Sequence, residues 1–180
     1  MQYEVYEVSV EANGQAIRSV VDGVAEVSPV FERRALSILE NNGISDPVPG
    51  QWYPMQNYLD AIRELEDTIG PKTVERVGRQ IPKVVEWPDH IDSVPIALGQ
   101  LDEVYQMNHR GGEIGYYEFK QTGERDGKMT CRNPYPCSLD TGLIIGTMDK
   151  FSPTGSFTRL TEDGRGREDG KSRCIYSVNW

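Results

Sequence analysis

Apolar residues recur at helical spacing through the first 110 residues of the chain. The clearest stripe places apolar side chains three or four positions apart and is followed by Gly70, a residue type that commonly ends helices: Tyr58, Leu59, Ile62, Leu65 and Ile69. Residues 16–24 fit either a helix or a strand, and a helix is favoured. Further helices are predicted over residues 30–42, 72–81 and 94–108.

Residues that end or cap helices mark the limits of these segments. Pro82 is expected to stop the helix that begins near residue 72, because proline lacks the N–H that continues a helix. Ser93 is expected to cap the next helix. Residues 44–54 hold three prolines and a glycine and predict a loop. Alternation of Tyr6, Val8 and Val10 predicts a short strand before the first helix.

After Gly111 the pattern changes to the alternation typical of strands. Strands are predicted over residues 114–121 and 128–132, then a helix over residues 139–151 capped by Ser138, then strands over residues 156–162 and 172–180. In the last strand four residues share one face: Cys174, Tyr176, Val178 and Trp180.

These elements predict an α+β fold in which an N-terminal helical block packs on a C-terminal four-stranded antiparallel sheet with one inserted helix. Residues 1–180 are expected to form a single domain, mainly helical over residues 1–110 and β-β-α-β-β over residues 111–180. At 180 residues, such a chain can bury a sound core without disulfides.

Charge and hydropathy exclude several partners. The formal net charge of −9 and the lack of a dense basic run argue against nucleic acid. No apolar run approaches the roughly 20 residues that span a bilayer. The N-terminus carries acidic residues and no basic segment, unlike a signal peptide. We therefore expect a cytoplasmic protein, whose thiols stay reduced.

The segment "CRNPYPC" places Cys131 and Cys137 around two prolines, with Cys174 far along the chain. A structural zinc site needs four ligands, usually in tight pairs, and here His109 would have to be the fourth. A reactive thiolate is a second interpretation, since Cys137 lies beside a predicted helix start. Buried or pocket-lining thiols are the interpretation that the spacing favours, and no metal site is predicted.

Catalytic motifs are absent from the sequence: there is no nucleophile elbow, no H-E-x-x-H and no phosphate-binding loop. The chain is therefore not expected to be an enzyme. Aromatic, imidazole and thiol side chains near the predicted junction of helices and sheet are instead candidate walls of a ligand pocket. These candidates are Trp52, Tyr105, His109, Tyr117, Cys131 and Tyr135.

The order of elements, with "LDEVYQMN", "MTCRNPYPCSLDTGLIIGTMDKF" and "GKSRCIYSVNW", resembles one known superfamily. It contains haem–nitric oxide/oxygen binding domains, 4-vinyl reductase domains and the TRAPP vesicle-tethering subunits. The front half, from "GQAIRSVVDGV" to "WYPMQNYLDAIRELEDTIG", resembles myxobacterial proteins of similar length.

This resemblance implies a fold that encloses a ligand between helices and sheet. In the haem-binding branch a histidine in the context L-D-x-L-H ligates the iron, and here "LDEVY" places Tyr105 at that position. A Y-x-S-x-R motif for the haem propionates should follow, but "CRNPYPC" stands there instead. No cofactor is therefore expected, neither haem nor zinc.

Three functions follow from this comparison. The leading one is a sensory domain for a small hydrophobic or aromatic molecule, signalling to a partner protein in trans or through a homodimer. The second is an interaction scaffold of the tethering-complex type, with its cavity filled by side chains or an acyl chain. The third is a haem-based gas sensor that uses Tyr105 or His109 as the axial ligand.

Overall fold

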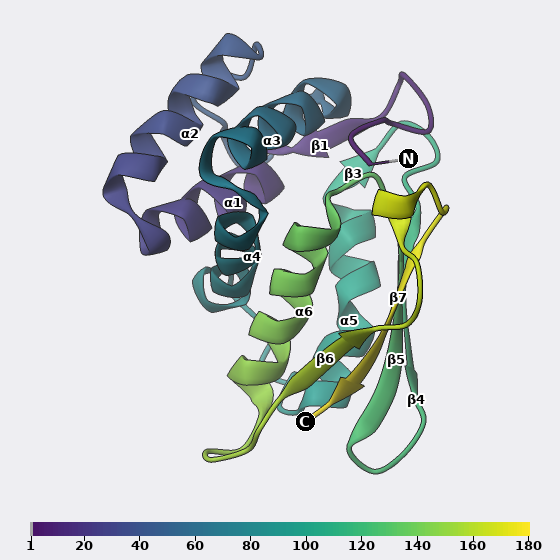
Figure 1. Cartoon of the computed structure of the whole chain (residues 1–180). Coiled ribbons are helices and arrows are strands. Elements are labelled where there is room, and N and C mark those ends of the chain that lie inside the picture. Colours follow the sequence, from purple (N-terminus) through teal and green to yellow (C-terminus); the bar gives the residue numbers. More distant parts are fainter. Residues whose placement is uncertain (1) are drawn as a thin grey trace.

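The apolar stripes of the first half form helices in the computed structural model, which describes residues 2–180. The helices are α1 (Gly14–Val27), α2 (Pro29–Asn41), α3 (Met55–Ile69), α4 (Pro71–Val84), α5 (Val94–Met107) and α6 (Cys137–Phe151). Gly70 separates α3 from α4 with a φ of 82°, a conformation that favours glycine. α6 packs on α4, and α5 packs on β4 (Tyr116–Gln121), so α5 and α6 lie between the other helices and the sheet (Figure 1).

Two predicted helix boundaries are wrong by a turn or less. α4 continues past Pro82 to Val84, because the proline occupies the last turn, where only one backbone hydrogen bond is lost. The carbonyl oxygen of Pro82 accepts hydrogen bonds from Trp87 Nε1 and Lys150 Nζ, each at 2.8 Å. Ser138 does not cap α6, which begins at Cys137 with Pro136 at the N-cap, and its hydroxyl donates to Glu66 instead.

The predicted four-stranded antiparallel sheet is confirmed. It consists of β4, β5 (Asp126–Arg132), β6 (Arg159–Glu162) and β7 (Cys174–Asn179), in the order β4-β5-β7-β6. The chain crosses between β5 and β6 through α6, which lies against one face of the sheet (Figure 1). Cys174, Tyr176, Val178 and Trp180 are all buried, so the α+β fold class and the inward face of the last strand are as predicted.

A second, three-stranded sheet was not predicted. It pairs β1 (Glu11–Asn13) with β2 (Trp52–Pro54) and β3 (His109–Arg110), in the order β2-β1-β3. The strand expected over residues 6–10 is absent from the described residues; Val8 is 95% exposed there, and Val10 N–H donates to the Glu7 carbonyl in a turn. Strands of two or three residues carry too short an alternation to be recognised from sequence.

Small residues let α4 and α6 approach closely. A Cβ atom on Gly142 would lie 2.0 Å from the Glu75 carbonyl oxygen, and one on Gly146 would lie 2.5 Å from the Arg79 carbonyl oxygen. Glycine at these positions therefore lets the two backbones touch, which fixes α6 relative to the helical block. Among residues 2–180, no helix combines the length and apolar character needed to cross a membrane.

Candidate functional site

A cavity of about 780 Å³ opens between the start of α1, the loop over residues 85–90, α5 and α6. This volume lies within the range of about 300–1,000 Å³ common for small-molecule and cofactor sites. Its deep wall is made of aromatic and aliphatic side chains: Tyr58, Leu101, Tyr105, Tyr117, Tyr135, Leu139 and Leu143. An open, largely apolar cavity thus lies between the helical block and the sheet.

Charge is confined to the mouth of this cavity. Glu86 on the loop and Glu103 on α5 are exposed at its rim, beside Gln15 and His90. Among residues 2–180, none of those that line it is a lysine or an arginine. The deep part therefore offers hydrogen-bonding and aromatic groups to a ligand, but no positive charge.

Four aromatic rings form the floor of the cavity. The Tyr105 ring centroid lies 4.3 Å from that of His109, 5.2 Å from that of Tyr117 and 6.2 Å from that of Tyr135. The Tyr105 hydroxyl donates to the Ile114 carbonyl at 2.5 Å, and burial raises its pKa well above the usual value. Tyr105 is therefore a neutral phenol whose proton is used in the hydrogen bond to the Ile114 carbonyl.

His109 is held by hydrogen bonds at both ring nitrogens. Nδ1 lies 2.7 Å from the Tyr105 carbonyl oxygen, which can only accept, so Nδ1 carries the proton. Nε2 is then the unprotonated nitrogen and accepts from the Tyr135 hydroxyl at 2.8 Å. Burial lowers the pKa of His109 to about 4, because the charged imidazolium would lose its hydration. The ring is neutral near neutral pH.

This depressed pKa predicts a pH-dependent stability. The unfolded chain takes up the imidazole proton near its usual pKa of 6.5, whereas the folded protein does so only near 4. Acid therefore favours the unfolded state, and stability is lost as the pH falls through 6.5 towards 4. Between about pH 8 and about pH 5 the wild type is expected to lose roughly 2 kcal/mol more than His109→Gln. Urea unfolding of both proteins checks this, and parallel pH profiles would contradict it.

The structure brings together four of the six predicted site residues. Tyr105, His109, Tyr117 and Tyr135 line the cavity. Trp52 does not: it lies on β2, opposite Asn13, where the Arg110 guanidinium stacks 4.3 Å from its ring centroid. Cys131 is also outside the lining, buried within the sheet between Tyr117 and Cys174. That the four lining residues contact a ligand stays a prediction.

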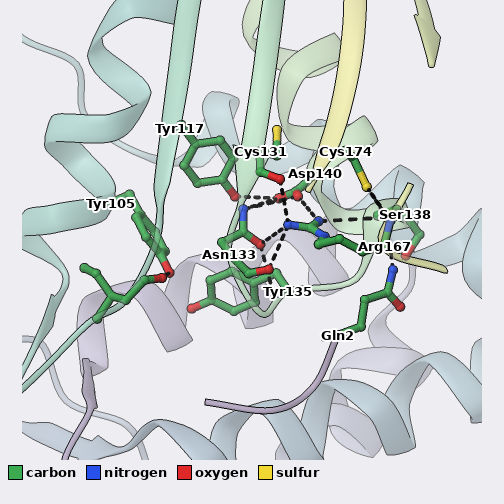
Figure 2. A network of polar contacts seen from close by, with 12 residues as sticks. Gln2, Tyr105, Tyr117, Cys131, Asn133, Tyr135, Ser138, Asp140, Arg167 and Cys174 are labelled. Atoms are coloured by element: carbon green, nitrogen blue, oxygen red, sulfur yellow. Dashed lines mark hydrogen bonds and ion pairs between the residues drawn. The ribbon is translucent and has the colours of Figure 1, made fainter. Parts of the chain in front are cut away.

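A buried ion pair behind the cavity was not foreseen. Arg167, on the short 3₁₀ helix η1 (Arg167–Asp169), pairs with Asp140 on the first turn of α6, and both side chains are 1% exposed. Asp140 also accepts from the Tyr117 hydroxyl at 2.5 Å, and Arg167 donates to the carbonyl and the side-chain oxygen of Asn133, both at 2.8 Å (Figure 2). This network joins the cavity floor to the loop between β6 and β7.

The sequence held only a weak signal for this network. Arg167 lies in "DGRGREDG", which reads as an exposed polar turn, and nothing distinguishes it from Arg165 in the same segment. Asp140 is an acidic residue in the first turn of a helix, a placement that is usual at exposed helix starts too. Only the fold shows that these two residues meet.

No protein-family model matches the chain, and no curated protein matches it. Solved structures of H-NOX domains do match. An oxygen-binding H-NOX domain related to soluble guanylate cyclases, in its oxygen complex, is 18% identical with a TM-score of 0.67, over 93% of this chain and 94% of the other. A mutant H-NOX domain of T. tengcongensis is 17% identical with a TM-score of 0.67, over 93% and 96% of the two chains.

A further match bears on the cofactor. A structure described as "Modulating Heme Redox Potential Through Protein-Induced Porphyrin Distortion" is 18% identical with a TM-score of 0.67, over 93% of this chain and 99% of the other. The expectation that the chain takes no cofactor rested on the loss of the histidine and Y-x-S-x-R motif. The matched structures contradict that expectation, because the fold of this chain recurs in a protein whose haem redox potential is modulated. At this low identity the comparisons show that the chain has the fold of H-NOX domains.

Proposed function

We propose that the chain is a sensory domain that binds a largely apolar ligand of about the size of haem, with haem as the foremost candidate. The observation that carries the proposal is the open cavity of about 780 Å³, whose floor holds an unprotonated imidazole nitrogen that is hydrogen-bonded to Tyr135. H-NOX domains of the same fold support a sensor rather than a scaffold. An open cavity also does not favour a scaffold of the tethering-complex type whose cavity is filled by side chains.

The residues on the cavity floor fit haem through His109 rather than Tyr105. Histidine ligands of metals usually donate their other ring N–H to a carboxylate or a backbone carbonyl, as His109 Nδ1 does to Tyr105. The Tyr135 hydroxyl oxygen lies 2.8 Å from Nε2, so the Tyr135 side chain would have to turn away before Nε2 could bind iron. Tyr105 would have to give up its proton against a raised pKa. Haem iron would supply a coordination position for a small gaseous molecule.

The lack of lysine and arginine along the wall restricts how haem could lie. Its two propionates carry negative charge, which is costly to bury without a partner. At the mouth of the cavity they would meet water, but also the like charges of Glu86 and Glu103. This orientation leaves the apolar porphyrin to the aromatic and aliphatic wall.

Titration of the purified protein with hemin tests the proposal. We expect a Soret band that saturates at one haem per chain. His109→Leu is expected to lower the affinity by roughly tenfold or more and to change the band, whereas Tyr105→Phe, which removes a hydroxyl from the same floor, leaves both nearly unchanged. If Tyr105→Phe abolishes the band and His109→Leu retains it, the assigned ligand is wrong.

A blocked cavity provides the control for location. Ala16→Trp places a large side chain in the lining on α1 and is expected to abolish binding, while Arg18→Trp adds the same side chain to the same helix outside the lining. Equal binding by these two variants would place the haem elsewhere. Absence of any saturable Soret band in the wild type would refute haem.

A neutral hydrophobic or aromatic molecule is the second candidate. The specific observation in its favour is that the lining holds no lysine or arginine but has Glu86 and Glu103 at the rim. Such a wall suits an uncharged ligand better than a dianion. Native mass spectrometry of the freshly purified protein, compared with Ala16→Trp, would detect the co-purified molecule.

A further inference from the structure

Two of the three cysteines meet at the far end of the buried network. Cys137 is the first residue of α6, and Cys174 is the first residue of β7. Their sulfur atoms lie 2.7 Å apart although the residues are 37 positions apart in sequence. Cys131, one strand away and opposite Cys174 in the sheet, takes no part in this contact.

Polar groups converge on the Cys137 sulfur. The Gln2 side-chain amide donates to Cys137 Sγ at 3.0 Å, and the Arg167 guanidinium lies 3.9 Å from the same sulfur. Its position in the first turn of a fifteen-residue helix adds the positive end of the helix dipole. The hydrogen bond with Cys174, followed by the Arg167 cation, lowers the pKa of Cys137 below its usual value and favours its thiolate.

The neighbouring thiols have the opposite environment. Cys131 is fully buried in the sheet, and burial raises its pKa well above the usual value. Cys174 shares its proton with Cys137, which raises its own pKa, and its sulfur accepts from the Arg167 backbone N–H at 3.2 Å. The structure therefore holds one thiol whose thiolate is stabilised, one thiol in contact with it, and one thiol isolated in the sheet; all three are buried.

We propose that Cys137 and Cys174 form an oxidation site that closes to a disulfide when the protein meets a hydroperoxide. The Cys137 thiolate attacks the peroxide, so that an S–O bond forms and the O–O bond breaks; the hydroxide that leaves takes up the proton released by Cys137 and becomes water. The Cys174 thiol then attacks the sulfenic sulfur, an S–S bond forms, and hydroxide leaves with the Cys174 proton as water. Two thiols and one hydrogen peroxide give one disulfide and two waters.

A divalent metal suits this cluster less well. Glu162 adds a carboxylate, and the ligand atoms of Cys137, Glu162 and Cys174 lie within 4.8 Å of one another. A structural zinc site, however, needs a fourth ligand, and the described residues of this cluster supply three. The Arg167 guanidinium, 3.9 Å from Cys137 Sγ, also opposes a second cation there.

Oxidation would tie the start of α6 to the sheet. Asp140 on the first turn of α6 binds both Arg167 and Tyr117, so the new bond would lie one turn from the network behind the cavity. Oxidation of the two thiols would thus act next to Asp140, which holds Tyr117 on the cavity floor. The oxidation itself is independent of any cavity ligand.

Peptide mapping of the full chain tests the proposal directly. Trypsin separates the three cysteines onto the peptides Met129–Arg132, Asn133–Lys150 and Cys174–Trp180. After reduction, removal of the reductant and treatment with a roughly tenfold excess of hydrogen peroxide, we expect the last two peptides to be joined. Cys131 should remain free to be alkylated, with Cys137 oxidised at least about tenfold faster than Cys131.

Serine variants assign the roles. Cys131→Ser should form the same disulfide as the wild type, and Cys137→Ser should form none. In Cys174→Ser, Cys137 should stop at the sulfenic acid, which dimedone traps. Three results would overturn the proposal: a disulfide that includes Cys131, three thiols that survive peroxide, or stoichiometric zinc that must be chelated before the thiols react. The map of the wild-type protein decides between these outcomes even if a variant does not fold.

Discussion

Arg167→Ala is expected to lower the free energy of unfolding by about 3–5 kcal/mol, because it leaves the Asp140 carboxylate buried without its cation. Both side chains of the pair are 1% exposed, so water does not screen the loss as it would at the surface. Within the described part of the chain, Asp140 would keep the Tyr117 hydroxyl and the Asn133 amide as its partners. Urea unfolding at neutral pH measures the change.

Two comparisons separate the buried charge from other effects. Arg165→Ala removes an exposed arginine from the same loop and should change stability by less than about 0.5 kcal/mol. The double variant Arg167→Leu with Asp140→Leu should recover part of the loss, since no unpaired charge remains. A small effect of Arg167→Ala, similar to that of Arg165→Ala, would mean that Asp140 finds another partner or is solvated.

The helices and the four-stranded sheet could be predicted because their apolar periodicity is long. Five apolar residues over twelve positions define α3, and the alternation in β7 assigns Cys174, Tyr176, Val178 and Trp180 to the core. The three-stranded sheet could not be predicted in the same way. Its strands have two or three residues each and take their partners from segments 39 to 99 positions apart, such as Asn13 with Trp52 and Glu11 with Arg110.

The candidate site was predicted only as far as its aromatic residues. Tyr105, His109, Tyr117 and Tyr135 follow from the expected junction of helices and sheet, and they do line the cavity. The charged residues behind the cavity were harder to predict, because the sequence around a buried arginine does not differ from the sequence around an exposed one. Arg167 is buried because Asp140 and three oxygen acceptors on Cys131 and Asn133 surround it, and this is decided entirely by tertiary structure.

The thiols illustrate the same limit. The spacing between Cys131 and Cys137 drew attention to those two residues as a pair, but the prolines between them turn the chain from β5 into α6. Cys131 consequently stays in the sheet, while Cys137 meets Cys174, which β7 brings alongside β5. Proximity in sequence suggested the pair Cys131 and Cys137, whereas the pairing of strands brings Cys137 and Cys174 together.

Gly142→Ala is expected to destabilise the protein by about 3 kcal/mol or more, because the added methyl group would meet backbone atoms on α4. A Cβ atom at this position lies 2.0 Å from the Glu75 carbonyl oxygen and 2.9 Å from the Arg79 nitrogen. Backbone atoms of a packed helix cannot move aside as a flexible side chain can. The two helices must therefore separate, and thermal and urea unfolding would record the loss.

Gly99→Ala provides the matched control with the opposite sign. Gly99 lies in α5 with nothing within 4 Å of an added Cβ, so alanine should stabilise the protein by roughly 0.5–1 kcal/mol through its better helix propensity. Separation of α4 from α6 would also displace Leu139 and Leu143, which line the cavity from α6. Gly142→Ala should therefore weaken ligand binding as well as folding. If Gly142→Ala loses stability but binds the ligand as tightly as Gly99→Ala does, then α6 can shift without reshaping the cavity.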